Sequence, residues 1–189
     1  MSEIKIQANS SGGGVYTLQS GTGSTDRTIT LPDATTTLSA NMPLGYDSWY
    51  LNTAQTSNAD ITAWTRRTTN YLNIGDAMTV SSGVFTFPST GIYKIELFTL
   101  ADFVAATSDQ ANITIKKSTD NFSSSNDVGF LICGPTWVAG HAHIDYMCDV
   151  ENTTTHKIKF TAGGLATGSK FAGGSTTYTY VSFTKLGET

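Results

Sequence analysis

The sequence is poor in several residue types that mark large classes of protein. Only 14% of its 189 residues are charged, the net charge is -4, and lysine and arginine form no cluster. A nucleic-acid groove or a polybasic membrane patch needs clustered basic residues, so the composition argues against both partners. No stretch approaches the roughly 18 consecutive apolar residues of a membrane span. The opening MSEIKIQANS lacks the layout of a secretory signal, and we expect a soluble chain outside the general secretion route.

Cysteine and helix-forming patterns are also scarce. The two cysteines, Cys133 and Cys148, lie within apolar alternating runs, a setting typical of buried free thiols rather than of a disulfide scaffold. No segment has apolar residues spaced by three and four over three helical turns, whereas threonine, serine, glycine and aromatic residues are abundant. These features predict an all-β protein.

The clearest strand pattern is GVFTFPSTGIYKIELFTL, from Gly83 to Leu100. Residues 84–87 alternate, residues 88–91 are turn formers, and residues 92–100 alternate again. This arrangement predicts a β-hairpin.

Both faces of the longer strand in this pattern carry large apolar side chains. Tyr93, Ile95 and Leu97 share one face, and Phe98 and Leu100 lie on the other, because side chains alternate along a strand. A strand on the surface of a monomer usually has one polar face. We therefore expect Phe98 and Leu100 to be covered by a second layer or by another copy of the chain.

The motif P-x-x-G-[IV]-Y, here Pro88 to Tyr93, resembles the tumour necrosis factor and C1q-like jelly rolls. The resemblance extends over residues 46–187, where about eight short strands separated by turns favour a two-sheet sandwich. It implies a compact trimer. In that family the final strand and the strand after Gly-[IV]-Tyr are neighbours in the inner sheet, and their outward aromatics pack around the threefold axis.

Carried over to this chain, the resemblance implies a subunit interface formed by outward side chains of two strands. These residues are Phe98, Leu100, Tyr178 and Tyr180. The alternative is that the tyrosines lie under a loop of the same chain. The chain departs from the animal C1q-like proteins in having neither Gly-X-Y repeats nor heptads, so their receptor-ligand functions are not carried over.

Residues 1–40 differ from the rest and are interpreted as an anchoring arm before a head domain at 46–189. Short alternating segments are separated by Gly- and Ser-rich turns, with too few apolar residues for an independent core. The arm must pack on something else, unless it is a disordered tail. Its candidate anchoring residues are Ile4, Ile6, Tyr16, Leu18, Ile29 and Leu31.

The arm sequence SGTGSTDRTITLPDATTTL resembles segments of fibre and other virion structural proteins of tailed bacteriophages. The match is short and of low complexity. It implies a setting, the virion assembled in the host cytoplasm, rather than a mechanism.

Several details of the head can also be predicted. Residues 59–64 are interpreted as its first strand, and Arg66 and Arg67 as a solvated edge or an intersubunit pair rather than a ligand clamp. His156 follows a Thr run at a turn and is expected to be exposed. The Gly-rich segment 163–174 lacks the features of a phosphate loop and is expected to form a flexible tip.

One constellation could bind a metal ion. His141, His143, Asp145 and Asp149 alternate onto one strand face, close to Cys148. A zinc site needs three or four converging ligands, and no other segment supplies an obvious partner. A polar strand face that lines an interface or solvent is the favoured interpretation, and no metal or other cofactor is expected.

Other ligand and catalytic patterns are weaker still. Asp120 and Asp127 are too sparse for a calcium site, and no nucleophile motif or carboxylate pair stands out. We therefore expect a protein that is not an enzyme.

The leading hypothesis is a homotrimeric virion structural protein of a tailed phage, which decorates or cements the capsid. Its partners are its own copies and the major capsid protein or another virion protein. The alternative is a tail-fibre or receptor-binding tip, whose loops at 101–110, 118–127 and 163–174 meet a host surface glycan. Exposure of Phe103, Phe122 and Phe171 at the trimer apex would favour it. A metal-dependent enzyme centred on His141, His143 and Asp145 is the third.

Overall fold

The computed structural model describes residues 45–104, 110–134 and 139–189, which form two antiparallel β-sheets. No helix in these ranges is long and apolar enough to cross a membrane. The candidate anchoring residues of the arm, together with the rest of residues 1–40, lie outside the described residues.

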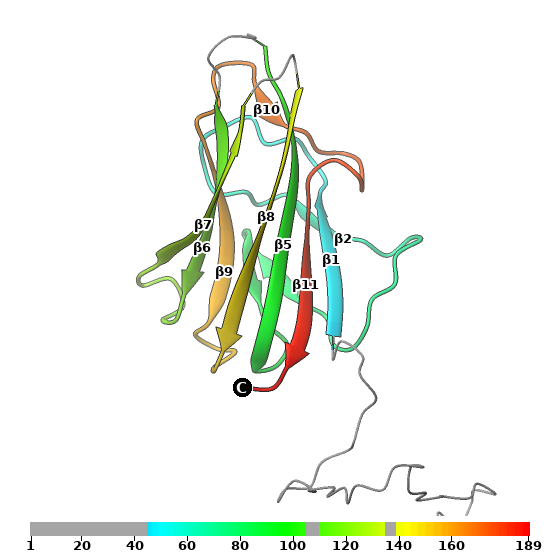
Figure 1. The fold of residues 1–189 in the computed structure, drawn as a ribbon, viewed down its shortest axis with the longest axis vertical. Coiled ribbons are helices and arrows are strands. Elements are labelled where there is room, and N and C mark those ends of the chain that lie inside the picture. The colour runs from blue at the N-terminus through cyan, green and yellow to red at the C-terminus, as the bar shows by residue number, and fades with distance from the viewer. Residues whose placement is uncertain (1–44, 105–109, 135–138) are drawn as a thin grey trace, which may run out of the picture. The chain divides into compact units, whose positions relative to one another are not determined.

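Sheet A combines strands from the beginning, the middle and the end of the described chain (Figure 1). Strand β1 pairs with β2 on one side and with β11 on the other, β11 pairs with β5, and β5 pairs with β8. A short strand, β10, pairs with the last residues of β5. Their bounds are β1 Gly45–Leu51, β2 Trp64–Arg66, β5 Gly91–Asp102, β8 Ala139–Val150, β10 Lys170–Phe171 and β11 Tyr180–Gly187.

Sheet B has the strand order β3, β4, β9, β6, β7. Its strands are β3 Thr79–Ser81, β4 Val84–Thr86, β6 Ala111–Ser118, β7 Asn126–Cys133 and β9 Lys157–Gly163. Together the two sheets enclose one apolar core, as expected for a sandwich in which each sheet turns one face inward.

The centre of the core is a cluster of aromatic rings from both sheets. Phe85 of β4 is fully buried, and its ring centroid lies 5.6 Å from that of Trp49, 5.9 Å from Trp64, 5.8 Å from Phe160 and 5.0 Å from Phe183. Most of these pairs meet edge to face, the arrangement that ring quadrupoles favour. These contacts hold the sheets in fixed relative positions.

The predicted hairpin at residues 83–100 is wrong, although both of its strands exist. Strand β4 belongs to sheet B and β5 to sheet A, so the turn between them carries the chain across the sandwich. Phe87 and Tyr93, on either side of that turn, pack together with ring centroids 4.8 Å apart. Gly91 has φ 139°, and a Cβ there would lie 2.5 Å from the carbonyl oxygen of Gly187. Glycine is therefore required at this position.

The predicted first strand at residues 59–64 is also wrong. The first described strand is β1, and the segment after it crosses to sheet B, where Asp60 forms an isolated bridge with Thr161. The chain then returns to sheet A at Trp64. The apolar residues that suggested a strand, Ile61 and Trp64, are buried because this crossing closes one side of the core.

Two other expectations are corrected. His156 is 7% exposed rather than solvated, because a turn bond from its N–H to the carbonyl of Asn152 folds it inward. The segment 163–174 is not simply a flexible tip: it contains β10, and Phe171 is fully buried opposite Ala101.

The other alternation predictions are confirmed. Residues 93, 95 and 97 face the core, and both cysteines are buried free thiols. Burial raises the pKa of the Cys148 thiol to about 11.

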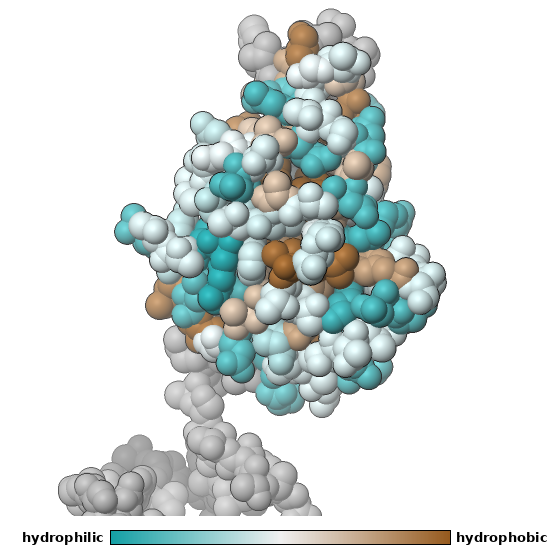
Figure 2. All heavy atoms as spheres, turned by 180° about the vertical axis from the view of Figure 1, so that it is seen from behind, coloured by the Kyte–Doolittle hydropathy of each residue, from teal (hydrophilic) through white to brown (hydrophobic). Residues whose placement is uncertain are grey.

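The view from behind shows a surface of mostly hydrophilic or neutral residues, with hydrophobic residues in small separate groups (Figure 2). The outer face of sheet A, which points away from sheet B, carries half-buried Phe98, Leu100 and Tyr180.

Candidate subunit interface

A line of aromatic side chains crosses the outer face of sheet A. Tyr50 of β1 lies opposite Tyr180 of β11, Tyr180 lies opposite Phe98 of β5, and Phe98 lies opposite His143 of β8. We call these four residues the aromatic row. The rings of Phe98 and Tyr180 are stacked, with centroids 5.2 Å apart and planes 20° apart. Directly opposed residues on one sheet face are neighbours, so the four side chains lie in one line across β1, β11, β5 and β8.

Three of the four interface residues predicted from the sequence lie together on this face. Phe98, Leu100 and Tyr180 are all half-buried there. Tyr178 does not join them, because β11 begins only at Tyr180; Tyr178 is 42% exposed and its N–H bonds to the carbonyl of Ser175 in the preceding turn. The alternation was predicted correctly, but the predicted final strand, residues 176–186, begins four residues before β11 does.

Strand β1 contributes residues that the sequence analysis missed. Tyr46 and Tyr50 point to the outer face, with Ser48 between them, while Asp47, Trp49 and Leu51 are buried toward sheet B. The alternation of Tyr46, Ser48 and Tyr50 is visible in the sequence. No strand is predicted there, because the first strand of the head is placed at residues 59–64.

A buried carboxylate fixes β1 in place. Asp47 is 2% exposed; its Oδ1 accepts bonds from the Ser48 N–H at 3.0 Å and the Arg66 Nε–H at 2.7 Å. Its Oδ2 accepts bonds from the Met78 N–H at 2.8 Å and the Trp49 Nε1–H at 3.1 Å. Four donors compensate the desolvated charge, and they tie β1 to β2 and to the segment before β3.

Arg67, directly after β2, lies on the same outer face as the aromatic row. Its guanidinium carbon is 3.9 Å from the ring centroid of Tyr180 and 4.5 Å from that of Tyr71. Arg67 is 4% exposed, which contradicts the solvated-edge alternative and leaves the intersubunit pair as a prediction. Burial lowers its pKa. Its Nη1 is 3.4 Å from Ser48 Oγ, whereas Nε and Nη2 have no partner among the described residues. Cation–π contact with two rings replaces part of the lost hydration.

The outer face continues onto the edge strand β8. His141, His143, Asp145, Met147 and Asp149 alternate along it, and all are exposed, as the sequence predicted for this strand. Met147 is 49% exposed and lies opposite Lys94, whose Nζ bonds to Glu96 at 2.7 Å. That bond to Glu96 raises the pKa of Lys94.

A shallow hollow of about 220 Å³ lies over the middle of this face. It is lined by Tyr46, Glu96, Phe98, His143, Tyr180 and Ser182. The lining combines aromatic rings with a few polar groups, a composition that is common at the centre of protein interfaces.

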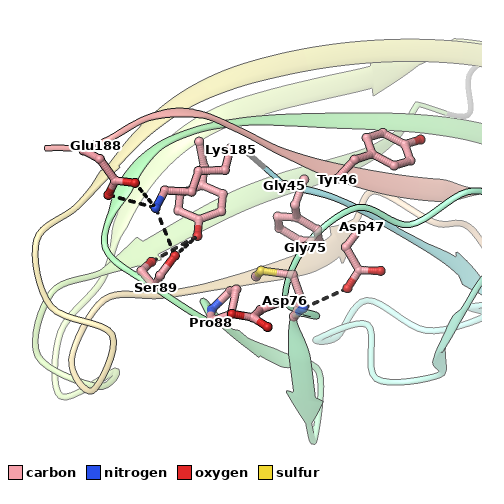
Figure 3. A pocket seen from close by; sticks show the side chains of 12 residues that line it. Gly45, Tyr46, Asp47, Gly75, Asp76, Pro88, Ser89, Lys185 and Glu188 are labelled. Atoms are coloured by element: carbon pink, nitrogen blue, oxygen red, sulfur yellow. Dashed lines mark hydrogen bonds and ion pairs between the residues drawn. The ribbon is translucent and has the colours of Figure 1, made fainter. Parts of the chain in front are cut away.

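A second hollow, of about 320 Å³, opens at the end of the sandwich near Gly45 (Figure 3). Lys185 Nζ is 2.9 Å from both carboxylate oxygens of Glu188 and 3.1 Å from Ser89 Oγ. The Tyr93 hydroxyl donates to the Ser89 carbonyl at 3.1 Å. These bonds hold the turn between β4 and β5 against the end of β11, which is a structural role.

Within the described ranges, no three His, Cys, Asp or Glu side chains of one chain converge on a metal position. Asp120 is occupied in its own loop: it accepts bonds from Ser118 Oγ at 2.7 Å and from Ser124 Oγ at 2.6 Å. These bonds, with Ser124 the larger cause, lower the pKa of Asp120 to about 2. Asp127 forms an ion pair with Lys116.

The loop aromatics proposed to meet a glycan do not form an exposed group. Phe103 is 4% exposed and Phe171 is fully buried, because each lies on the core side of a strand or strand end. Phe122 is half-buried beneath Lys159, whose Nζ is 4.7 Å from its ring centroid.

Comparison with known proteins gives similarity of structure but not of sequence. No family model matches the chain, and no curated protein sequence matches it. A crystal structure of murine APRIL at pH 8.5 matches with a TM-score of 0.57 and 12% identity, covering 75% of this chain and 98% of that one. The structure of Eiger TNF from S. frugiperda matches with a TM-score of 0.60 and 9% identity, covering 78% and 96%. The strand order and these similarities show that the chain has the tumour necrosis factor-like jelly-roll fold.

Proposed function

We propose that the chain is a non-enzymatic structural protein that associates with its own copies as a homotrimer through the outer face of sheet A. The observation that carries this proposal is the aromatic row, together with Leu100 and Met147 on the same face. A sheet face of this size and apolarity is not needed by a monomer. Neighbouring outward positions on β11 carry Ser182 and Thr184, so the face also offers hydrogen-bonding groups around its aromatic centre.

Stable association requires a contact larger than a single residue can supply. Specific interfaces bury about 800 Å² on each partner, and apolar area contributes roughly 25 cal/mol per Å² before the costs of association. Phe98, Leu100 and Tyr180 are half-buried within one chain, so only part of each side chain remains to be covered. The association therefore depends on the whole face rather than on one residue.

We place this trimer in the virion of a tailed phage, as a capsid decoration or cement protein. The support is the resemblance of SGTGSTDRTITLPDATTTL to phage virion proteins. A homotrimer with threefold rotational symmetry also matches the symmetry of the threefold positions of an icosahedral shell. Residues 1–40 would anchor the head to the major capsid protein or to another virion protein.

The rival function, a receptor-binding tip, loses the feature that favoured it, because Phe103 and Phe171 are buried. It remains the alternative outcome of the test below.

The test measures the binding of purified protein to capsids that lack it and to host cells. Full-length protein is compared with a variant that lacks residues 1–40, after light scattering has given the mass of each. We expect trimers in both cases and capsid binding by the full-length protein alone. A trimer that ignores capsids but adheres to host cells would contradict the decoration role and support the receptor-binding tip.

A further inference from the structure

Two histidines share the outer face of β8 beside the centre of the aromatic row. His141 lies opposite Leu100 and His143 opposite Phe98, and both side chains are exposed. The His141 ring centroid is 5.9 Å from that of Phe98, and His143 lines the hollow that Phe98 and Tyr180 also line. Both imidazoles thus lie on the face proposed to be the interface, on the edge strand next to Phe98 and Leu100.

These imidazoles are free to act as ligands. Neither makes a hydrogen bond or an ion pair with another described residue. Positions two apart on a strand point the same way and lie roughly 6.7 Å apart along it. Imidazole nitrogens bind at about 2.0–2.1 Å from a zinc ion, so two such side chains can lean toward one ion between them. Imidazole is a ligand that suits zinc, copper, iron and nickel.

One chain alone cannot complete such a site, because no three suitable side chains converge among its described residues. Symmetry can supply the rest, and this step rests on the proposed trimer. Directly opposed residues on neighbouring antiparallel strands have Cα atoms about 4.5–5.5 Å apart. A threefold axis that brings three Phe98 side chains together therefore brings three copies of His143 with them, and His141 follows one pleat away.

The charges around the two histidines favour a cation. Glu96 and Asp145 lie opposite each other on the same face, and Asp149 follows on β8. Lys94 pairs with Glu96, which leaves the carboxylates of Asp145 and Asp149 without an ion pair among the described residues. Clustered carboxylates produce a negative potential that raises the local concentration of cations.

We propose that the trimer binds one divalent first-row transition-metal ion on its threefold axis, through the imidazoles of His141 and His143 from the three chains. The ion joins the three copies, in addition to the aromatic contacts. Because it binds the assembled form only, it stabilises that form by mass action.

The test uses full-length protein without a histidine tag, stripped with chelator and then dialysed against NiCl₂ or, separately, ZnCl₂. Elemental analysis gives bound metal and light scattering gives mass. We expect one ion per three chains. His143→Gln should abolish binding and His141→Gln should weaken it at least tenfold, while Phe130→Leu, on the outer face of sheet B, should leave it unchanged.

The outcomes separate this proposal from the proposed function. A trimer that binds no metal, or that binds one ion per chain, overturns the metal site and leaves the trimer intact. A monomer in chelator that becomes a trimer on adding nickel supports the site. A monomer with and without metal contradicts the trimer, and the metal site with it.

Discussion

The outer faces of the two sheets differ in the strands that lie at their centres. In sheet A, the central strands β5 and β11 present the apolar residues Ile92, Phe98, Leu100 and Tyr180 beside the charged residues Lys94, Glu96 and Asp102. In sheet B, the central strands β6 and β9 present outward residues that are mostly threonine, lysine and asparagine, among them Asn112, Thr114, Lys159 and Thr161. The exposed apolar residues of sheet B, Phe130 and Ile132, lie only on its edge strand β7.

This difference shows which face is built for contact. Lys159 and Thr161 of sheet B are already occupied by Asp60, at 2.9 Å and 2.6 Å, so that face is satisfied within one chain. On sheet A, two nitrogens of the buried Arg67 have no partner among the described residues, and the aromatic row is only half-covered. We therefore expect the outer face of sheet B to be exposed to solvent and the outer face of sheet A to contact a second copy of the chain.

The largest change in stability is expected from a substitution in the core that lies between the two sheets. Phe85→Ala deletes a fully buried ring that touches four other aromatic rings, and should lower the free energy of unfolding by about 3–5 kcal/mol. Denaturant titration at fixed protein concentration measures this loss. Phe130→Ala, at an exposed ring on sheet B, should change it by less than about 0.5 kcal/mol. Equal losses would mean that the core is packed differently.

Replacing one carboxylate in or beside each sheet gives a closer comparison of the two sheets. Asp47→Asn in sheet A replaces one carboxylate oxygen, which accepts two hydrogen bonds, by an NH₂ group that cannot accept them. The free energy of unfolding should fall by about 2–4 kcal/mol. Asp60→Asn beside sheet B affects a side chain that is 41% exposed, and should cost less than about 1 kcal/mol. Thermal unfolding of the two variants, measured in parallel, shows which of them loses more stability. A larger loss for Asp60→Asn would contradict the role assigned to Asp47 in fixing β1.

The smallest effect concerns the loop between β6 and β7. The pKa of Asp120 is lowered from 3.8 to about 2, so its carboxylate stabilises the folded state above about pH 4, and this contribution is lost as the pH falls toward 2. Asp120→Asn should therefore be slightly less stable than the parent at pH 7 and equal to it near pH 2. Ser124→Ala removes a donor to the same carboxylate and should show the same trend. A difference that persists unchanged at pH 2 would contradict this assignment.

Local periodicity predicted which residues share a strand face, because alternation depends only on neighbours in the sequence. The two faces of β5 and the burial of Cys148 follow from it. It could not tell that β4 and β5 belong to different sheets, since a four-residue turn can either reverse a strand within one sheet or carry it to the other. The resemblance to the jelly-roll family gave the two-sheet sandwich and the pairing of the final strand with β5, but not the sheet to which β4 belongs.

The candidate interface was predicted only in part, because some of its contacts depend on pairing between strands that are distant in the sequence. Phe98, Leu100 and Tyr180 were identified from alternation and the family resemblance, whereas Arg67 was assigned to a solvated edge or an intersubunit pair. Its contacts with Tyr71 and Tyr180 depend on a register between β1, β2 and β11, which strands far apart in the sequence create only on folding. Such a contact leaves no local signal.

The most direct test of the account is the mass of two matched variants in solution. Phe98→Glu places a charge at the centre of the outer face of sheet A, and Phe130→Glu places one on the outer face of sheet B, at a ring that is 56% exposed. We expect light scattering to give three times the 20.1 kDa chain mass for the parent and for Phe130→Glu, and a single chain mass for Phe98→Glu with an unchanged circular dichroism spectrum. A Phe98→Glu trimer, or a parent monomer, would contradict self-association through sheet A.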